Sequence, residues 1–400
     1  MKRRPVYATI LLCLASVTLA ARTLTVSALD GHYIGYDLSF STTITNKGSQ
    51  PIYLASNRLT EPTTFLFPND TSQSVRLTTS SHNLKIEVDA DGNQIGVFEV
   101  EELLQPRQSV TVEVGFRAYL SVTATRKLEW TPELDYTFSR SKRDIPHELL
   151  EKYCSPAGPW RINDTAPSWL SVRELAYALA RNETNVLRAV MLLVDWVGRN
   201  IKYPTAKRDR ILLPNETLAQ REGDCDEQAN LLISMCRILD IPAYLRCGCV
   251  YLPARTEKGS KSDGHLFYNL DRMAWHAWAM VYVPPWGWLP VDMTMGYSSE
   301  YPLLAIQGAA SQSLSTVVSN DYFATDYVTE TNRDAEKLKR MEVYVQEKGS
   351  MRPTLIAPEY QATAGAGMTT ATLIIFGIAV IATYIGARAK AIARTRQIKR

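Results

Sequence analysis

The 400-residue sequence has no marked excess of either charge, with 44 lysines and arginines against 41 aspartates and glutamates, a formal net charge of +3. Nine of the basic residues lie at the two ends, three near the N-terminus and six after residue 387, which leaves 35 basic residues against 41 acidic ones in the body. A body with a slight excess of acid is a poor match for the phosphate backbone of nucleic acids. We therefore expect no nucleic acid among its partners.

Cysteine is scarce, with six residues in the whole chain. Cys13 lies in an apolar run at the N-terminus, and the remaining five are Cys154, Cys225, Cys236, Cys247 and Cys249. An odd number favours one free thiol and two disulfide pairs in an oxidising compartment, and the sequence does not define their connectivity. Cys225 and Cys236 would lie about 16 Å apart along one helix, so they cannot pair with each other.

Long apolar runs are also few, and the two that occur lie at the ends. Residues 1–21 carry three basic residues, an apolar run and small residues near Ala20, the pattern of a signal peptide or, alternatively, an N-terminal membrane anchor. Residues 365–387 contain no charged residue and reach roughly 34 Å as a helix, enough to cross a bilayer. A buried helix of a soluble domain is the alternative.

The basic tail at residues 388–400 decides the expected topology. Its six positive charges, with no acid among them, are expected to remain in the cytoplasm. The body would then be extracytoplasmic, held at the cell membrane by one transmembrane helix. Four N-glycosylation sequons agree weakly with export: Asn69, Asn163, Asn182 and Asn215.

Between the two ends, 46% hydrophobic and 21% charged residues are typical of globular proteins and exclude general disorder. Residues 22–140 alternate apolar and polar side chains, most clearly from Val110 to Leu120, and Gly and Asn mark turns between such runs. This pattern predicts a β-sandwich domain of Ig-like size. His32 and His82 stand alone in it and are expected at the surface.

Proline-rich stretches separate the expected domains. Residues 141–167 are a predicted connector, in which Trp160 is expected to pack against a neighbour, and residues 349–364 are a predicted linker to the membrane helix. A polar segment from Pro253 to Arg272, which includes His265, is either a lid over an active site or an ordinary surface insertion.

The stretch from Arg221 to Asp292 carries the chemistry. Cys225 directly precedes a helical pattern with apolar residues at spacings of three and four. In the first turn of a helix, free N–H groups and the helix dipole favour the thiolate, so we expect a low pKa for this thiol. About fifty residues later, His276 lies on a predicted strand, and Asp292 lies on the next one. Cysteine, histidine and aspartate in this order are typical of a nucleophilic site.

The turn between the two strands raises a geometric question. A tight hairpin centred on Pro284 to Gly287 would pair Asp292 with Ala279, three residues or roughly 10 Å from His276. We therefore expect a wide or bulged turn.

The motifs around these three residues resemble the core of the transglutaminase-like superfamily. The resemblance covers roughly residues 168–300 and rests on Gly223 to Glu227, Cys236 to Ala243, His276 to Trp278, and Gly287 to Thr294. It implies an α+β fold with a papain-like catalytic domain at residues 168–348, in which Cys225 is the nucleophile, His276 the base and acid, and Asp292 the residue that orients the histidine. It implies no metal or organic cofactor. Candidates for a second oxyanion donor or substrate contact are Gln220, Trp196, Tyr203 and Trp278.

The resulting hypothesis is a membrane-anchored, extracytoplasmic cysteine peptidase or amidase that acts on proteins or peptides at the cell surface. A protein cross-linking transglutaminase is an alternative, although calcium clusters like those of animal transglutaminases are not evident. A catalytically silent binding or scaffold protein is another. The sequence does not define the oligomeric state.

Overall fold

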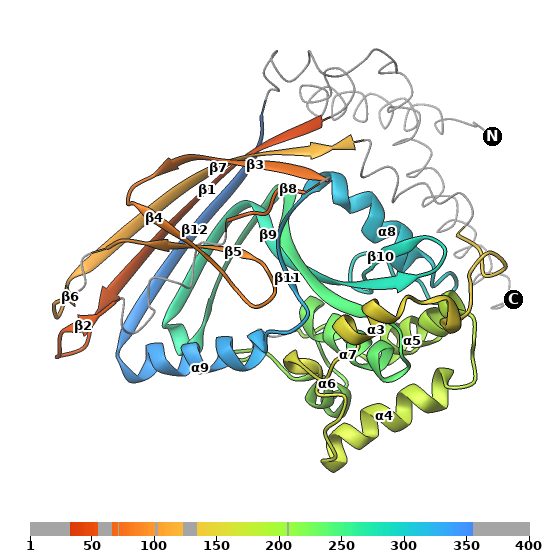
Figure 1. The fold of residues 1–400 in the computed structure, drawn as a ribbon. Helices are drawn as coiled ribbons and strands as arrows, with labels where there is room; N and C mark the ends of the chain where they lie inside the picture. The colour runs from red at the N-terminus through yellow and green to blue at the C-terminus, as the bar shows by residue number, and fades with distance from the viewer. Residues whose placement is uncertain are drawn as a thin grey trace, which may run out of the picture. The chain divides into compact units, whose positions relative to one another are not determined.

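A mixed β-sheet of eight strands dominates the computed structural model, which describes residues 33–54, 66–70, 72–100, 103–122, 134–205 and 208–354. The neighbouring strands run in the order β11, β8, β9, β12, β1, β7 and β3, and β10 adds to β9 (Figure 1). Their bounds are β1 Tyr33–Asn46, β3 Gln73–Ser80, β7 Ser109–Ser121, β8 Ala243–Lys261, β9 Leu266–Val283, β10 Gly287–Val291, β11 Thr316–Tyr322 and β12 Val343–Thr354.

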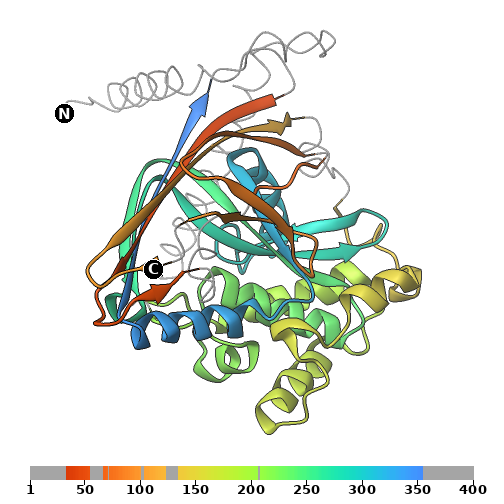
Figure 2. The same ribbon diagram turned by 60° about the vertical axis from the view of Figure 1, so that its left-hand side comes forward.

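This sheet differs from the expected Ig-like sandwich at residues 22–140. Strands β1, β7 and β3 come from that region, but they continue the sheet that contains His276. Strand β12, from the other end of the chain, lies between β9 and β1 (Figure 2). A separate sandwich is absent from the described residues because strand β12 supplies β1 with a partner.

Two small two-stranded sheets complete the N-terminal part. Strands β2 (Ile52–Tyr53) and β6 (Leu103–Leu104) pair, as do β4 (Leu84–Val88) and β5 (Gln94–Phe98). The turn of the β4–β5 hairpin is fastened to the segment before helix α9 (Tyr327–Arg340). There the carboxylate of Asp91 accepts hydrogen bonds from the N–H groups of Phe323 and Thr325 at 3.0 and 3.1 Å.

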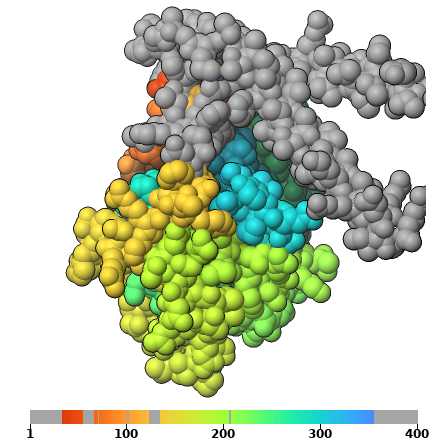
Figure 3. All heavy atoms as spheres, turned by 90° about the vertical axis from the view of Figure 1, so that its right-hand side faces the viewer, coloured from red at the N-terminus to blue at the C-terminus, as the bar shows by residue number. Residues whose placement is uncertain are grey.

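Helices from the middle of the chain pack together and enclose the main core. They are α3 (His147–Tyr153), α4 (Pro167–Ala180), α5 (Val186–Asn200), α6 (Pro214–Gln220), α7 (Cys225–Ile238) and, after β10, α8 (Leu304–Gln312). Figure 3 shows the outer side of this layer, with α8 in cyan beside the yellow and green helices. Helix α5 buries an apolar stripe that includes Val190, Leu193 and Val197. Trp160, in the expected connector, is fully buried.

Two expected loops are strands instead. The polar segment from Pro253 to Arg272 continues β8 and β9 as one long hairpin, so it is not a loop that could close as a lid. His265 near its tip stacks on Tyr344 and bonds the carbonyl of Val343 at 3.0 Å, which is a packing role. The start of the expected linker, residues 349–354, belongs to β12.

The signal segment at 1–21, the apolar segment at 365–387 and the basic tail at 388–400 lie outside the described residues. Within the part of the chain that the structure describes, no helix is both long and apolar enough to span a membrane.

Candidate active site

Strand β9 changes its partner along one edge from β12 to β10, and the candidate site lies where this change occurs. The first part of β9, from Leu266 to Asp271, pairs with β12, whereas its last part, from Ala279 to Val283, pairs with β10. On the other side β9 remains paired with β8 past His276. His276 therefore lies in the gap between β12 and β10, where one edge of β9 is left without a strand partner.

Strand β10 delivers Asp292 to this gap. Val291, its last residue, pairs with Ala279, so the register continued by one residue would place Asp292 opposite Trp278. The expected pairing with Ala279 was wrong by one residue. The difference matters because residues two apart on a strand share a face, so His276 and Trp278 point to the same side. A wide turn is not needed.

The imidazole and the carboxylate meet in this gap. Nε2 of His276 donates to Oδ2 of Asp292 at 2.5 Å, and Oδ1 accepts from the N–H and the hydroxyl of Thr294, both at 2.8 Å. Burial raises the pKa of Asp292, but the bonds from His276 and Thr294 outweigh it and hold the pKa below its usual value. An ionised carboxylate on Nε2 leaves Nδ1 as the nitrogen that can accept a proton.

Cys225 is the first residue of helix α7, as its sequence predicts. Its sulfur accepts a hydrogen bond from the backbone N–H of Ala277, next to His276 on β9. The thiol therefore lies at the open edge of β9, beside the histidine strand. The structure shows no hydrogen bond between this sulfur and the His276 ring. As the first residue of a helix, Cys225 also has an N–H with no intrahelical acceptor.

The expected low pKa of Cys225 is not what the surroundings produce. Burial raises the pKa of the thiol well above 9, and the neighbouring carboxylates of Asp226 and Asp224 raise it further. The hydrogen bond from Ala277 acts in the opposite direction but is outweighed. The helix N-terminus is thus too weak to offset desolvation and two adjacent acids, and the protonated thiol of Cys225 is favoured over the thiolate.

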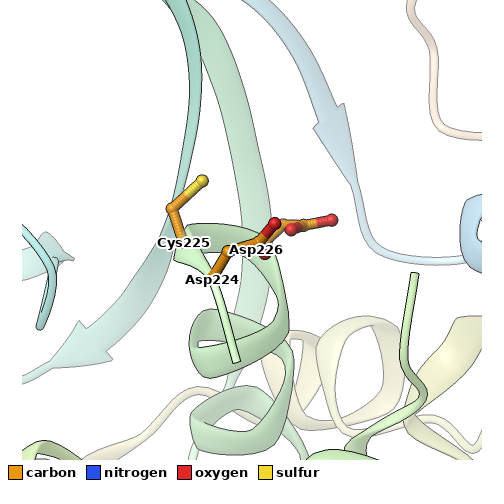
Figure 4. A group of neighbouring side chains, drawn as sticks. All are labelled: Asp224, Cys225 and Asp226. Atoms are coloured by element: carbon orange, nitrogen blue, oxygen red, sulfur yellow. The ribbon is translucent and has the colours of Figure 1, made fainter. Parts of the chain in front are cut away.

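The carboxylates of Asp224 and Asp226 lie side by side next to Cys225. Burial, with the charge of Asp226 and a hydrogen bond to it, raises the pKa of Asp224 to about 10. Figure 4 shows the two carboxylates turned to the same side of α7 while the sulfur projects away from them. One ligand atom from each of the three residues lies within 4.8 Å of the others, close enough to hold a cation. The raised pKa of Asp224 favours its protonated form, which is a poor cation ligand, and we assign no metal to this group.

The carboxylate of Glu227 holds the start of α7 in place through hydrogen bonds. Its carboxylate, almost fully buried, accepts the N–H of Asp224 at 2.9 Å and the N–H of Leu212 at 2.8 Å, and Nη2 of Arg208 lies 3.3 Å from it. The spacing from Asp224 to Glu227 is that of a capping box, so the sequence contained this signal. Tyr327 was not predictable in this way. Its hydroxyl donates to Asp226 at 3.0 Å from a helix 101 residues further along the chain.

The expected accessory residues lie in different surroundings. Trp278 stacks on the His276 ring, with centroids 5.9 Å apart, and so covers the base. Tyr203 is 59% exposed; partial burial of its hydroxyl, with Cys225 and nearby acids, raises its pKa, which places it near the thiol. Trp196 lies under the guanidinium of Arg221 at 4.7 Å. Gln220 is exposed at the end of α6, and no contact ties it to the site.

All five cysteines that the structure describes are free, so the expected disulfides among Cys154, Cys236, Cys247 and Cys249 are absent there. Of the four sequon asparagines, Asn69, Asn163 and Asn182 are exposed. Asn215 is half-buried and donates to Ser168 at 2.9 Å, which makes it the least suited to carry a glycan.

A free cysteine at a helix start, beside a histidine–aspartate pair on adjacent strands, defines a papain-like site of the cysteine type. Residues 173–293 match the model of the transglutaminase-like superfamily, so this stretch of the chain is similar to the core domain of that superfamily. The expected resemblance is thereby confirmed for the part of the chain that carries the site.

Individual relatives are distant. The uncharacterized protein YebA of Bacillus subtilis (strain 168) is 23% identical over 214 residues, which are 50% of this chain and 28% of that protein. The match therefore spans less than a third of the relative's length. A candidate cysteine protease from Cytophaga hutchinsonii has 14% identity and a TM-score of 0.43 over 81% of this chain and 89% of its own. The periplasmic domain of TgpA from Pseudomonas aeruginosa, bound to ethylmercury, has 17% identity and a TM-score of 0.33 over 66% and 73%.

Proposed function

We propose that the protein is a membrane-anchored, extracytoplasmic cysteine peptidase or amidase that cleaves amide bonds of proteins or peptides at the cell surface. The observation that supports this most is the 2.5 Å hydrogen bond between His276 and Asp292 at the gap in β9 that Cys225 also reaches. The free state of Cys225 agrees with a role as nucleophile. The membrane anchor at 365–387, the cytoplasmic tail and the outside location are part of the proposal and rest on the sequence alone.

The proposed reaction begins with a neutral thiol. As Sγ of Cys225 attacks the amide carbonyl carbon, Nδ1 of His276 takes the thiol proton, and Asp292 stabilises the imidazolium that results. The N–H of Cys225 donates to the oxygen of the tetrahedral intermediate. The C–N bond then breaks, His276 returns the proton to the leaving amine, and a thioester remains on Cys225. Water, activated by His276, hydrolyses the thioester and restores the thiol.

An amine in place of water would turn the same thioester into a cross-link, as in the transglutaminase alternative. The two reactions are separated by incubating the protein with casein in the presence and absence of dansylcadaverine. We expect new peptide termini, little incorporated fluorophore, and neither product with Cys225→Ala. Fluorophore incorporation that exceeds cleavage would favour cross-linking. Cleavage that persists in Cys225→Ala, or a complete lack of both products, would contradict the proposal, and the latter would favour the scaffold alternative.

A further inference from the structure

A cavity of about 630 Å³ lies between the β4–β5 hairpin, the segment 208–211, strand β12 and helix α9. Its volume is within the range of small-ligand sites. None of Cys225, His276 and Asp292 lines it, so it is separate from the active site. The hairpin that forms one wall is held to the segment before α9 through Asp91, which keeps the cavity walls together.

The charges around this cavity favour a cationic ligand. Its lining carries six acids: Glu87, Asp89, Asp209, Glu330, Asp334 and Glu347. The basic residues of the lining are Arg208, Arg210, Lys261 and Lys337. Two of them are engaged by acids outside it, because Arg208 lies 3.3 Å from Glu227 and Arg210 makes two 2.9 Å bonds to Glu216. Two of the acids are likewise paired with residues outside it, since Glu87 lies 2.8 Å from Lys85 and Asp334 lies 3.9 Å from Arg333. With all these pairs set aside, the lining has four acids against two lysines.

Glu347 on β12 is the best placed anchor for such a ligand. Its carboxylate makes no hydrogen bond or ion pair with any described residue, although the side chain is partly buried. Burial raises the pKa of Glu347 to about 7, and the charge of Lys261 opposes this only in part. The partly buried carboxylate lines the cavity and has no cationic group of a described residue within ion-pair distance, so a cation that enters the cavity can pair with it.

The other walls suit an alkyl chain that ends in a charge. Leu266, Val345 and Leu338 supply apolar surface, and the rings of Tyr322 and Tyr327 stack at 4.8 Å between centroids. Aromatic faces attract cations as well as alkyl groups. Tyr327 also connects the cavity to the active site, since its hydroxyl donates to Asp226, the residue after the nucleophile.

We propose that this cavity binds an alkylammonium group, carried either by a lysine side chain or by a free diamine, with the carboxylate of Glu347 as its anchor. The site does not require the proposed catalysis. Because the hydroxyl of Tyr327 bonds Asp226, an occupant that contacts Tyr327 would also change the surroundings of Asp226, next to the thiol.

Calorimetric titration of the whole protein tests this with three probes: Nα-acetyl-lysine amide, its uncharged analogue Nα-acetyl-norleucine amide, and 1,5-diaminopentane. We expect at least one cationic probe to bind and the norleucine probe not to bind. Preference for the lysine probe assigns the site to a polypeptide, and preference for the diamine assigns it to a free amine. Binding of neither cation, or equal binding of norleucine, would overturn the proposal.

Variants identify the anchor. Glu347→Gln should weaken binding by at least about tenfold, whereas Glu148→Gln, an exposed acid on α3, should leave it unchanged. Lys261→Met should tighten binding severalfold because a repelling charge is removed.

Affinity should fall as the pH drops below about 7, where Glu347 is protonated. An unchanged affinity in a Glu347→Gln protein with wild-type melting temperature would contradict the assignment. Binding should persist in Cys225→Ala, which separates this site from the catalysis.

Discussion

At the scale of single residues, the pKa of Cys225 determines how the site can act. A thiol whose pKa lies well above 9 is almost wholly protonated at neutral pH, so attack depends on proton transfer to His276. The apolar spacing after Cys225 predicted that this residue begins a helix, and the helix start alone favoured a low pKa for its thiol. The opposite result comes from the burial of the sulfur and from the side-by-side carboxylates of Asp224 and Asp226, whose directions a sequence does not contain.

The carboxylate pair leads to a first prediction. The double variant Asp224→Asn/Asp226→Asn removes the two charges that, after burial, contribute most to the raised pKa of Cys225, whereas Asp226→Asn alone would let Asp224 ionise in its place. We expect the pH midpoint of iodoacetamide labelling at Cys225 to move to lower pH, and labelling at pH 8 to become faster by about threefold or more. The measurement is peptide mapping of labelled protein. Glu148→Gln is the matched control, and a midpoint that stays in place or rises would contradict the electrostatic account.

Asp292 leads to a second prediction. Asp292→Asn keeps the shape but removes the charge that fixes the His276 ring, so kcat should fall by about 10²-fold or more with KM little changed. The variant should also report on stability. The folded-state pKa of Asp292 is below its unfolded value, so its stabilising effect is present above about pH 4 and is lost as the pH falls further.

Thermal melts at a series of pH values check the second part. The melting temperature of Asp292→Asn should lie below that of the wild type at pH 6, and the difference should shrink below about pH 4. A difference that is constant down to pH 2 would mean that the carboxylate is not held ionised by its partners.

At the scale of elements, strand β8 has to lie close to β11 to complete the sheet behind the site. Gly248 allows this approach, because a Cβ there would lie 2.6 Å from the carbonyl oxygen of Val317 and 3.1 Å from the side chain of Thr316. Gly248 is also the partner of His276 in the β8–β9 pairing. A displacement of the backbone at Gly248 would therefore also displace His276.

The third prediction follows from this contact. Gly248→Ala should lower the free energy of unfolding by about 1–3 kcal/mol, as overpacking does in a well-filled interior. Urea denaturation measures the effect, and Ser260→Ala, an exposed position on the same strand, should change it by less than about 0.5 kcal/mol. Equal stability of the two variants would show that β11 can move away from β8.

Several elements were predictable because their signals are local. Helix α7 begins at Cys225 as its apolar spacing predicts, and the strand with His276 lies where alternation placed it. The continuation of β8 and β9 through polar residues 253–265 was missed, since both faces of that hairpin arm are largely exposed and carry no apolar alternation. Pairing between β12 and β9 was also missed because it joins residues about 80 positions apart.

At the scale of the whole molecule, the N-terminal strands share one sheet with the strands of the candidate site. Ile44, Ile52 and Leu104 pack in one cluster with Leu338 and Val345 from α9 and β12. Alternation along residues 33–121 predicted strands correctly, but it did not indicate their partners, and this is why the separate sandwich was expected. The unit Gly35–Pro353 is therefore held together by contacts between its two ends.

The fourth prediction concerns this shared sheet. The isolated segment 33–122 should not fold, because β1 loses β12 and half of the Ile44 cluster is missing. The segment 33–354 should fold and melt cooperatively. Near-ultraviolet circular dichroism and thermal melting distinguish the two segments. A cooperative melt of 33–122 alone would contradict this prediction and show that the N-terminal strands form an independent domain.

In the proposed reaction Cys225, His276 and Asp292 act together to form a thioester, and mass spectrometry of the intact protein can detect that intermediate. After rapid mixing with a peptide ester and an acid quench, we predict an added mass equal to the acyl group, mapped to Cys225 and released by hydroxylamine. His276→Ala should abolish the adduct, and Asp292→Asn should slow its appearance. No adduct in the wild type, or an adduct mapped to another cysteine such as Cys247, would contradict the account.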